Sequence, residues 1–299
     1  MNHINNITNL ENEMVNLLLL ALKQPFLESN YINHPIRIIE ASKSLIGLNL
    51  KDPNKNIIDF LNSLKFEEIQ SSEEKPKVIK NETISIYQLE DAINNSDTDR
   101  INELLDNILN LSDGKHVLEF LVELSLRQKG QSLQVIWPIY KAMNFIGYND
   151  INTIRNSLDM ACKLLIFDDF HDASKEEKIS MEQLEVHRVK TVEQLYMIGV
   201  VHEISNFKFV RYDFIKQNLS LFLNHFHVSL NQSNPKPCKI KSNGLKEDSD
   251  LLEVLDSFTL SKEMILIFNS VRSIMKYSKS VNNRSIIYHI ENIKRLINE

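Results

Sequence analysis

The stretch from Ser85 to Gly147 decides the fold of this chain, and it reads SIYQLEDAINNSDTDRINELLDNILNLSDGKHVLEFLVELSLRQKGQSLQVIWPIYKAMNFIG. Its apolar residues recur at intervals of three and four, the spacing that gives a helix one buried face. Ser85, Asp97 and Asp113 each precede such a run, where a side-chain oxygen can accept a hydrogen bond from first-turn backbone N–H groups. The stretch therefore predicts four consecutive helices, the last of which ends at Gly147.

The flanking sequence continues this pattern in both directions. Upstream, Asn33 or His34 can cap a helix that begins with Pro35 and ends at Gly47. Glycine and proline are scarce, at 6 and 7 residues in 299, so the tight turns of a sheet are not expected. We expect an all-α bundle of stacked helical hairpins without a sheet. Besides those above, the expected helices span residues 12–24, 57–64, 154–166, 181–205, 211–226, 251–277 with a break at 259–261, and 282–298.

Two polar segments without a lasting period divide the chain, and each reads as a loop or linker. They separate three helical units, which alternatively pack together as one domain. The predicted divisions are an N-terminal hairpin unit at 1–66, a linker at 67–84, central hairpin repeats at 85–228, a loop at 229–249 and a C-terminal helical pair at 250–299.

Two segments of the chain resemble each other, which indicates an internal duplication. Residues 15–47 read VNLLLLALKQPFLESNYINHPIRIIEASKSLIG, and residues 118–147 read LEFLVELSLRQKGQSLQVIWPIYKAMNFIG. Each has an apolar helix, a polar connector and a helix with a proline near its start that ends in Ile-Gly. The alternative is that any two amphipathic hairpins look somewhat alike. Stacked repeats of this kind bury a continuous core only with their neighbours.

Composition limits the classes of function. A net charge of −6 gives no basic surface of the kind nucleic-acid binding requires, so no nucleic-acid partner is expected. The apolar run at 17–22 is too short to span a bilayer, so no membrane association is expected either. Cys162 and Cys238 are the only cysteines, which excludes a disulfide framework and favours a reducing, cytoplasmic location.

The segment Asn33–Ala41, NHPIRIIEA, resembles the Asn-His, aliphatic pair, Glu-Ala pattern of questin-oxidase-like proteins, an all-α oxidoreductase family. The block that starts at Leu89 is similar to helical repeats found next to Rieske domains in bacterial proteins. This resemblance implies an oxidoreductase-related protein that binds a small molecule between helices, with His34 as the catalytic residue. The chain departs from the pattern at Gly130-Gln131, where relatives carry Gly-His. Its two cysteines cannot form the Cys-x-His boxes of a Rieske cluster, and the cofactor stays unknown.

The residues themselves allow two interpretations of each candidate. A histidine at a helix start is held neutral by the nearby N–H groups, so His34 can act as a base or ligand, or simply cap the helix while packed against Tyr31. Trp137 and Tyr140 lie three positions apart and either line an aromatic ligand pocket or belong to the core.

A third candidate is the sequence DDFHD from Asp168, in which His171 and Asp172 resemble the metal-binding pair of HD phosphohydrolases. A metal that activates water needs at least three protein ligands, which His116, His202 or Asp213 would have to supply. The alternative is a solvated helix-capping turn. Three functions thus remain open: an oxidoreductase-related small-molecule binder, a non-catalytic scaffold for a protein partner such as a redox protein, and an HD-type metal-dependent phosphohydrolase.

Overall fold

The computed structural model describes residues 2–25, 28–66, 85–127, 131–168, 189, 191–231 and 248–280. Within these ranges the chain is all-α, as predicted, with twelve α-helices, one 3-10 helix and no strand. The helices are α1 (Asn2–Leu22), η1 (Glu28–Asn33), α2 (Pro35–Ile46), α3 (Lys55–Ser63), α4 (Ile86–Asn94), α5 (Thr98–Leu111), α6 (Lys115–Ser125), α7 (Leu133–Ile146), α8 (Ile151–Phe167), α9 (Val192–Ser205), α10 (Tyr212–Asn231), α11 (Asp248–Asp256) and α12 (Lys262–Ser280).

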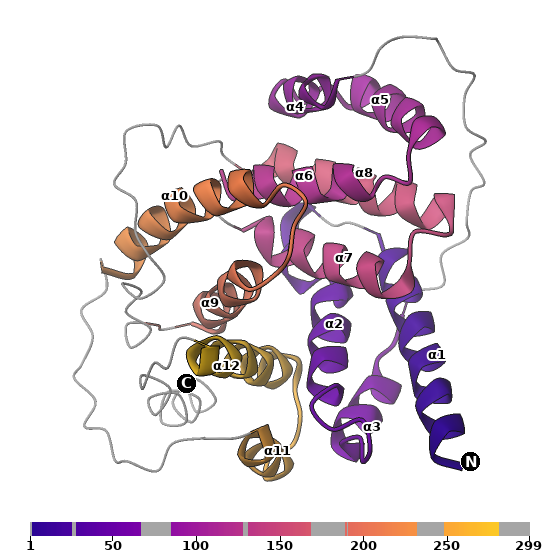
Figure 1. The fold of residues 1–299 in the computed structure, drawn as a ribbon, viewed down its shortest axis with the longest axis vertical. Coiled ribbons are helices and arrows are strands. Elements are labelled where there is room, and N and C mark those ends of the chain that lie inside the picture. The colour runs from indigo at the N-terminus through magenta and orange to yellow at the C-terminus, as the bar shows by residue number, and fades with distance from the viewer. Residues whose placement is uncertain are drawn as a thin grey trace.

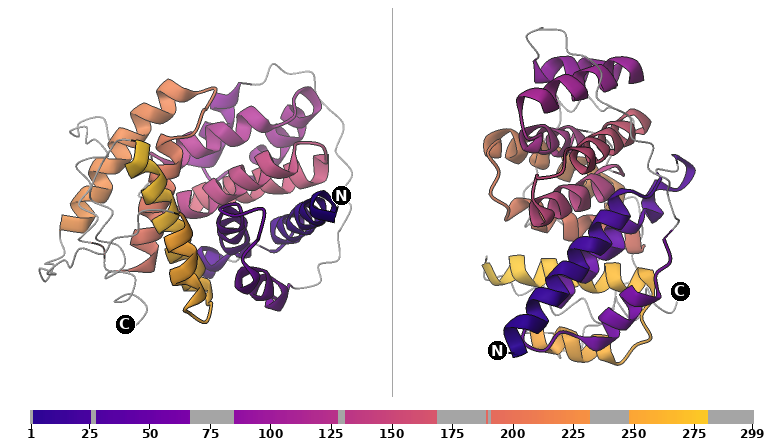
Figure 2. Two further views of the ribbon diagram at one scale, coloured as in Figure 1. Left: turned by 60° about the horizontal axis from the view of Figure 1, so that its bottom comes forward. Right: turned by 90° about the vertical axis from the view of Figure 1, so that its right-hand side faces the viewer.

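Helices far apart in the sequence share one hydrophobic core. Helix α2 packs against α1, α3, α7 and α12, and α12 also runs along α9 (Figures 1 and 2). Helix α7 contacts α6, α8 and α9, while α4 and α5 form an outer layer on α8 (Figure 1). The buried apolar residues form one continuous cluster from Met14 to Met275. None of the described helices combines the length and apolar character needed to cross a membrane.

Most of the predicted helix starts are confirmed by their capping bonds. The Ser85 side chain and Gln88 form a reciprocal capping box at α4. Asp97 Oδ1 accepts from the Arg100 backbone N–H at 3.0 Å. Helix α8, which begins at Ile151, is capped in the same way by Asp150, whose Oδ2 accepts from Thr153 N–H at 3.0 Å. The predicted break at 259–261 is also confirmed, because it falls in the connection between α11 and α12.

Other helix starts differ from the prediction. Helix α1 begins at Asn2 instead of Asn12. The cap position of α6 is Gly114, in the left-handed region (φ 71°), one residue after Asp113, whose side chain accepts the predicted bond from a first-turn backbone N–H, that of Lys115, at 3.0 Å. Glycine is needed there because a Cβ atom would lie 2.8 Å from a methyl group of Ile154.

Helix α7 also begins earlier than predicted. It starts at Leu133, so Pro138 lies inside the helix and not near its start. The Asp168 carboxylate, from the end of α8, accepts a hydrogen bond from Ser132 N–H at 2.6 Å and so stabilises this earlier turn. Pro35, in contrast, is the first residue of α2. The two similar segments therefore differ in the position of the proline within the helix, and the internal duplication stays a prediction.

Other predictions extend beyond the described residues. The predicted helix at 282–298 lies outside them, as does most of 181–191, and the described helix α9 starts at Val192. Helix α10 continues to Asn231, beyond its predicted end at residue 226 and into the predicted loop 229–249.

Helices α9 and α12 approach each other closely at Gly199. A Cβ atom at this position would lie 2.7 Å from Cα and 2.9 Å from Cβ of Ser270. Real Cβ atoms do not come so close to backbone atoms, so any larger residue would force the two helices apart. Glycine is costly inside a helix, and here close packing accounts for it.

We predict that Gly199→Ala destabilises the fold by about 1 to 3 kcal/mol, because overpacking at Ser270 outweighs the gain in helix propensity. The control is Gly47→Ala, where φ is −62° and a Cβ would have ordinary contacts with no atom closer than 3.4 Å. That variant should be neutral or slightly stabilised. Urea unfolding curves provide the comparison, and equal stability of both variants would contradict the close contact.

Candidate functional site

Four charged side chains meet where α2, α7, α9 and α12 come together. Lys141 Nζ lies 2.7 Å from Glu40 Oε2 and 2.7 Å from Glu203 Oε2, so one ammonium group bridges two carboxylates. Arg272 from α12 pairs with the other oxygen of Glu203. We call Glu40, Lys141, Glu203 and Arg272 the ion network. Each member comes from a different helix, so the network forms only when all four helices are assembled.

Both carboxylates of the ion network are saturated with donors. Trp137 Nε1 and Ser273 Oγ donate to Glu203 at 2.8 and 2.7 Å, in addition to its two cations. Burial alone would raise the pKa of Glu203, but the charges of Lys141 and Arg272 outweigh it and hold the pKa at about 2. The pKa of Glu40 is likewise lowered against its burial, by Lys141 and Lys43. Ionised carboxylates with occupied lone pairs are poorly placed to accept a proton from a substrate.

His34 is buried at the start of α2, with 4% of its surface exposed. Its Nδ1 accepts a hydrogen bond from Ile36 N–H at 3.3 Å, and Nε2 lies 3.4 Å from the carbonyl oxygen of Gln24. These two contacts require the neutral tautomer with its proton on Nε2. Burial lowers the pKa of His34 from 6.5 to about 4, partly opposed by the bond to Gln24. His34 is thus the cap of α2, and both ring nitrogens are occupied, while its packing against Tyr31 stays a prediction.

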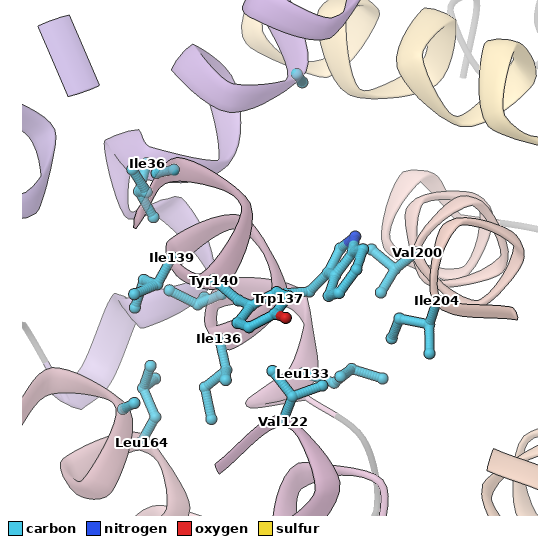
Figure 3. Packing of buried hydrophobic residues seen from close by; sticks show 14 of the residues in the cluster. Ile36, Val122, Leu133, Ile136, Trp137, Ile139, Tyr140, Leu164, Val200 and Ile204 are labelled. Atoms are coloured by element: carbon cyan, nitrogen blue, oxygen red, sulfur yellow. The ribbon is translucent and has the colours of Figure 1, made fainter. Parts of the chain in front are cut away.

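Trp137 and Tyr140 are core residues of α7. Their rings stack at a centroid distance of 5.6 Å, and Phe207 and Phe209 lie 5.4 to 5.9 Å from them. Figure 3 shows Trp137 reaching from α7 toward Val200 of α9. Both side chains are almost fully buried, and both polar atoms are bonded, Trp137 Nε1 to Glu203 and Tyr140 Oη to Glu119 at 3.4 Å. The core interpretation of this pair fits the structure.

A second pair of buried carboxylates lies on α6 and was not recognised in the sequence. Arg211 donates from its backbone N–H to Glu119 at 2.5 Å and from Nε to Glu123 at 2.7 Å. The Arg211 guanidinium also lies over the rings of Phe120 and Phe214, at 5.2 and 5.0 Å. Two glutamates four positions apart in an otherwise apolar helix were the available indication.

Arg37 is a buried cation paired with neutral acceptors. Its guanidinium donates to the carbonyl of Ile32 and to Gln134 Oε1 at 2.7 Å, and it stacks on the Tyr196 ring at 4.5 Å. Burial lowers its pKa, opposed by Tyr196. No carboxylate of the described chain forms a salt bridge with it, and Glu40 on the same helix pairs with Lys43 and Lys141. Arg37 thus links η1, α2, α7 and α9.

Only some of the residues considered for a metal site can be placed. His171 and Asp172 lie outside the described residues. His116 is exposed on α6, His202 is buried in α9 and Asp213 is exposed on α10. Within the described part of the chain, no three His, Cys, Asp or Glu side chains are grouped as metal ligands would be.

Comparison with known proteins adds no relative. No protein-family model, no curated protein and no solved structure matches this chain. The resemblance to questin-oxidase-like proteins therefore stays a prediction, as do the function and the site residues that it implies.

We predict that Lys141→Met lowers the free energy of unfolding by about 3 to 5 kcal/mol, because it leaves two carboxylates in the core without their shared cation. The matched control is Lys163→Met, which removes a half-exposed lysine paired with Asp159 within α8. Such surface pairs contribute less than about 0.5 kcal/mol. Chemical denaturation measures both, and equal effects would contradict the structural role of the ion network.

His34 makes the stability of the fold depend on pH. Its pKa is about 4 in the fold and 6.5 when unfolded, so the unfolded state binds more protons between these values. We predict that stability falls as pH drops from 6.5 to 4, by roughly 2 to 3 kcal/mol.

The variant His34→Asn keeps a side-chain oxygen for the cap but cannot titrate, so its stability should fall less over this window. Urea unfolding at pH 4.5 and pH 7 compares the two proteins. An identical loss of stability in both would show that His34 is not the group responsible.

Proposed function

We propose that this chain is a non-catalytic helical scaffold that binds a protein partner. The observation that carries this proposal is the state of His34, the residue expected to act as a catalyst. It is buried, neutral and bonded at both ring nitrogens, and its position is explained by the cap that it provides for α2. A catalytic histidine would need one nitrogen directed at a substrate.

The other candidates support the same proposal. The rings of Trp137 and Tyr140 are covered by Phe207 and Phe209, so their faces contact other core residues. The charged groups of the ion network pair with one another. The ionisable groups at the helix junction thus act between helices, which is what a rigid binding platform requires.

The questin-oxidase-like function remains a separate prediction. It would require His34 to leave its cap and the aromatic rings to separate so that a small molecule could enter between the helices. No contact among the described residues favours that rearrangement.

The test is brief formaldehyde cross-linking in the cells that produce the protein, followed by purification of the full chain. We expect mass spectrometry to identify one protein partner in stoichiometric amount, recovered equally with wild type and with His34→Asn, because the variant retains the cap. Organic extraction of the same samples tests the other function. A stoichiometric small molecule that is present in wild type and lost in His34→Asn would overturn the scaffold proposal.

A further inference from the structure

The connection between α9 and α10 alternates between buried and exposed side chains. Phe209 is buried in the aromatic cluster and Arg211 is bound to the carboxylates of α6. Between and beside them, Lys208, Val210 and Tyr212 are exposed. Residues 210 and 211 form a turn and Tyr212 is the first residue of α10, so the exposed side chains follow the connection into the start of the helix.

The inward residues hold this connection firmly. Phe209 lies 5.9 Å from Trp137 and 5.8 Å from Tyr140, measured between ring centroids. Arg211 is bonded to Glu119 and Glu123. A surface ordered in advance loses little conformational entropy on binding, which is a property of good docking sites.

Large apolar side chains are exposed where the connection ends and α10 begins. Val210, Tyr212 and Phe214 are 73%, 47% and 53% exposed. Val210 lies on the connection, and Tyr212 and Phe214 lie in the first turn of α10. Three large exposed apolar side chains within five residues resemble the anchors that dominate binding energy in protein interfaces. This segment passes from α9 to α10 on the front of the molecule in Figure 1.

The charges around these residues indicate what they bind. Lys208 and Lys216 are exposed at the two ends of the apolar group, while Arg211 is already paired with glutamates. Asp213 is the one acidic residue between them. The chain as a whole has a net charge of −6, so Lys208 and Lys216 carry a charge opposite in sign to that of the whole protein. Complementary charge around an apolar centre guides a partner of opposite sign.

We propose that the segment from Lys208 to Lys216 is the docking surface for an acidic segment of the partner protein that also presents apolar side chains. This proposal rests on the scaffold function above and names the surface that performs it.

The first test places the photo-cross-linking residue p-benzoylphenylalanine at position 210 of the full chain in its producing cells. The control places it at position 111, because Leu111 is 77% exposed and Val210 73%. We expect a cross-link to the partner from position 210 and none from position 111, with the linked peptide rich in Asp and Glu. Circular dichroism verifies that both variants keep the fold.

The second test measures binding of the identified partner to Lys208→Glu/Lys216→Glu. We expect affinity to fall about tenfold, with a weaker dependence on salt than wild type. The control Lys51→Glu/Lys55→Glu changes the net charge equally at other exposed positions and should bind as wild type does.

The outcomes separate the two proposals. A partner recovered with formaldehyde that gives no adduct at position 210, or that binds both charge variants equally, overturns the docking surface and leaves the scaffold function. Failure to recover any protein partner by either chemistry overturns both.

Discussion

One lysine between two buried carboxylates sets the condition on which this fold depends. Lys141 reaches Glu40 on α2 and Glu203 on α9, and Glu203 also requires Arg272 from α12. Removing charges from water costs several kcal/mol for each ion, and the attraction between them returns this only when geometry and hydrogen bonds are good. Any arrangement that misplaces one helix leaves a carboxylate or a cation without its partner. The main contribution of the ion network is therefore to favour one arrangement of the four helices over others. Its contribution to the net free energy of folding is smaller.

Helix α7 connects the ion network to the rest of the core. Trp137 donates to Glu203 and stacks on Tyr140, and Tyr140 in turn donates to Glu119 on α6. Each aromatic ring thus packs in the apolar core and has one polar atom bonded to a glutamate. The pair that most resembled a ligand pocket in the sequence instead joins the ion network to the carboxylates that hold Arg211. Neither ring could turn toward a ligand without breaking a buried hydrogen bond.

Several helix starts were predictable because the deciding interaction is local. The caps Ser85, Asp97 and Asp150 act within three residues of themselves, so their pattern is visible in the chain. The start of α7 was not predictable in this way, because it depends on Asp168, which lies 36 residues further on.

The same reason limited what could be said of the site. Lys141 and Glu203 are 62 residues apart, and no sequence pattern near either residue indicates that they form a pair. For His34, both the catalytic and the capping interpretation began from the same helix start. What the sequence could not show is that the carbonyl of Gln24, just after the end of α1, lies next to Nε2 of His34. The position of this carbonyl depends on how α1 packs against α2.

The late position of α12 has a consequence for how this protein is made. Helix α2 and helix α9 both pack on α12, and roughly 200 residues separate α2 from it. At about 5 to 20 residues per second, a ribosome needs about 10 to 40 s to cover that distance. During this interval the side of α2 that packs on α12 has no counterpart in the nascent chain. The same holds, once α9 has been made, for its side that packs on α12 and for Glu203, which lacks its second cation, Arg272. Closure of the core is thus a late event of synthesis, and contacts at such long separation also close slowly. Until then these apolar surfaces are exposed on the growing chain, where they are prone to associate with other proteins.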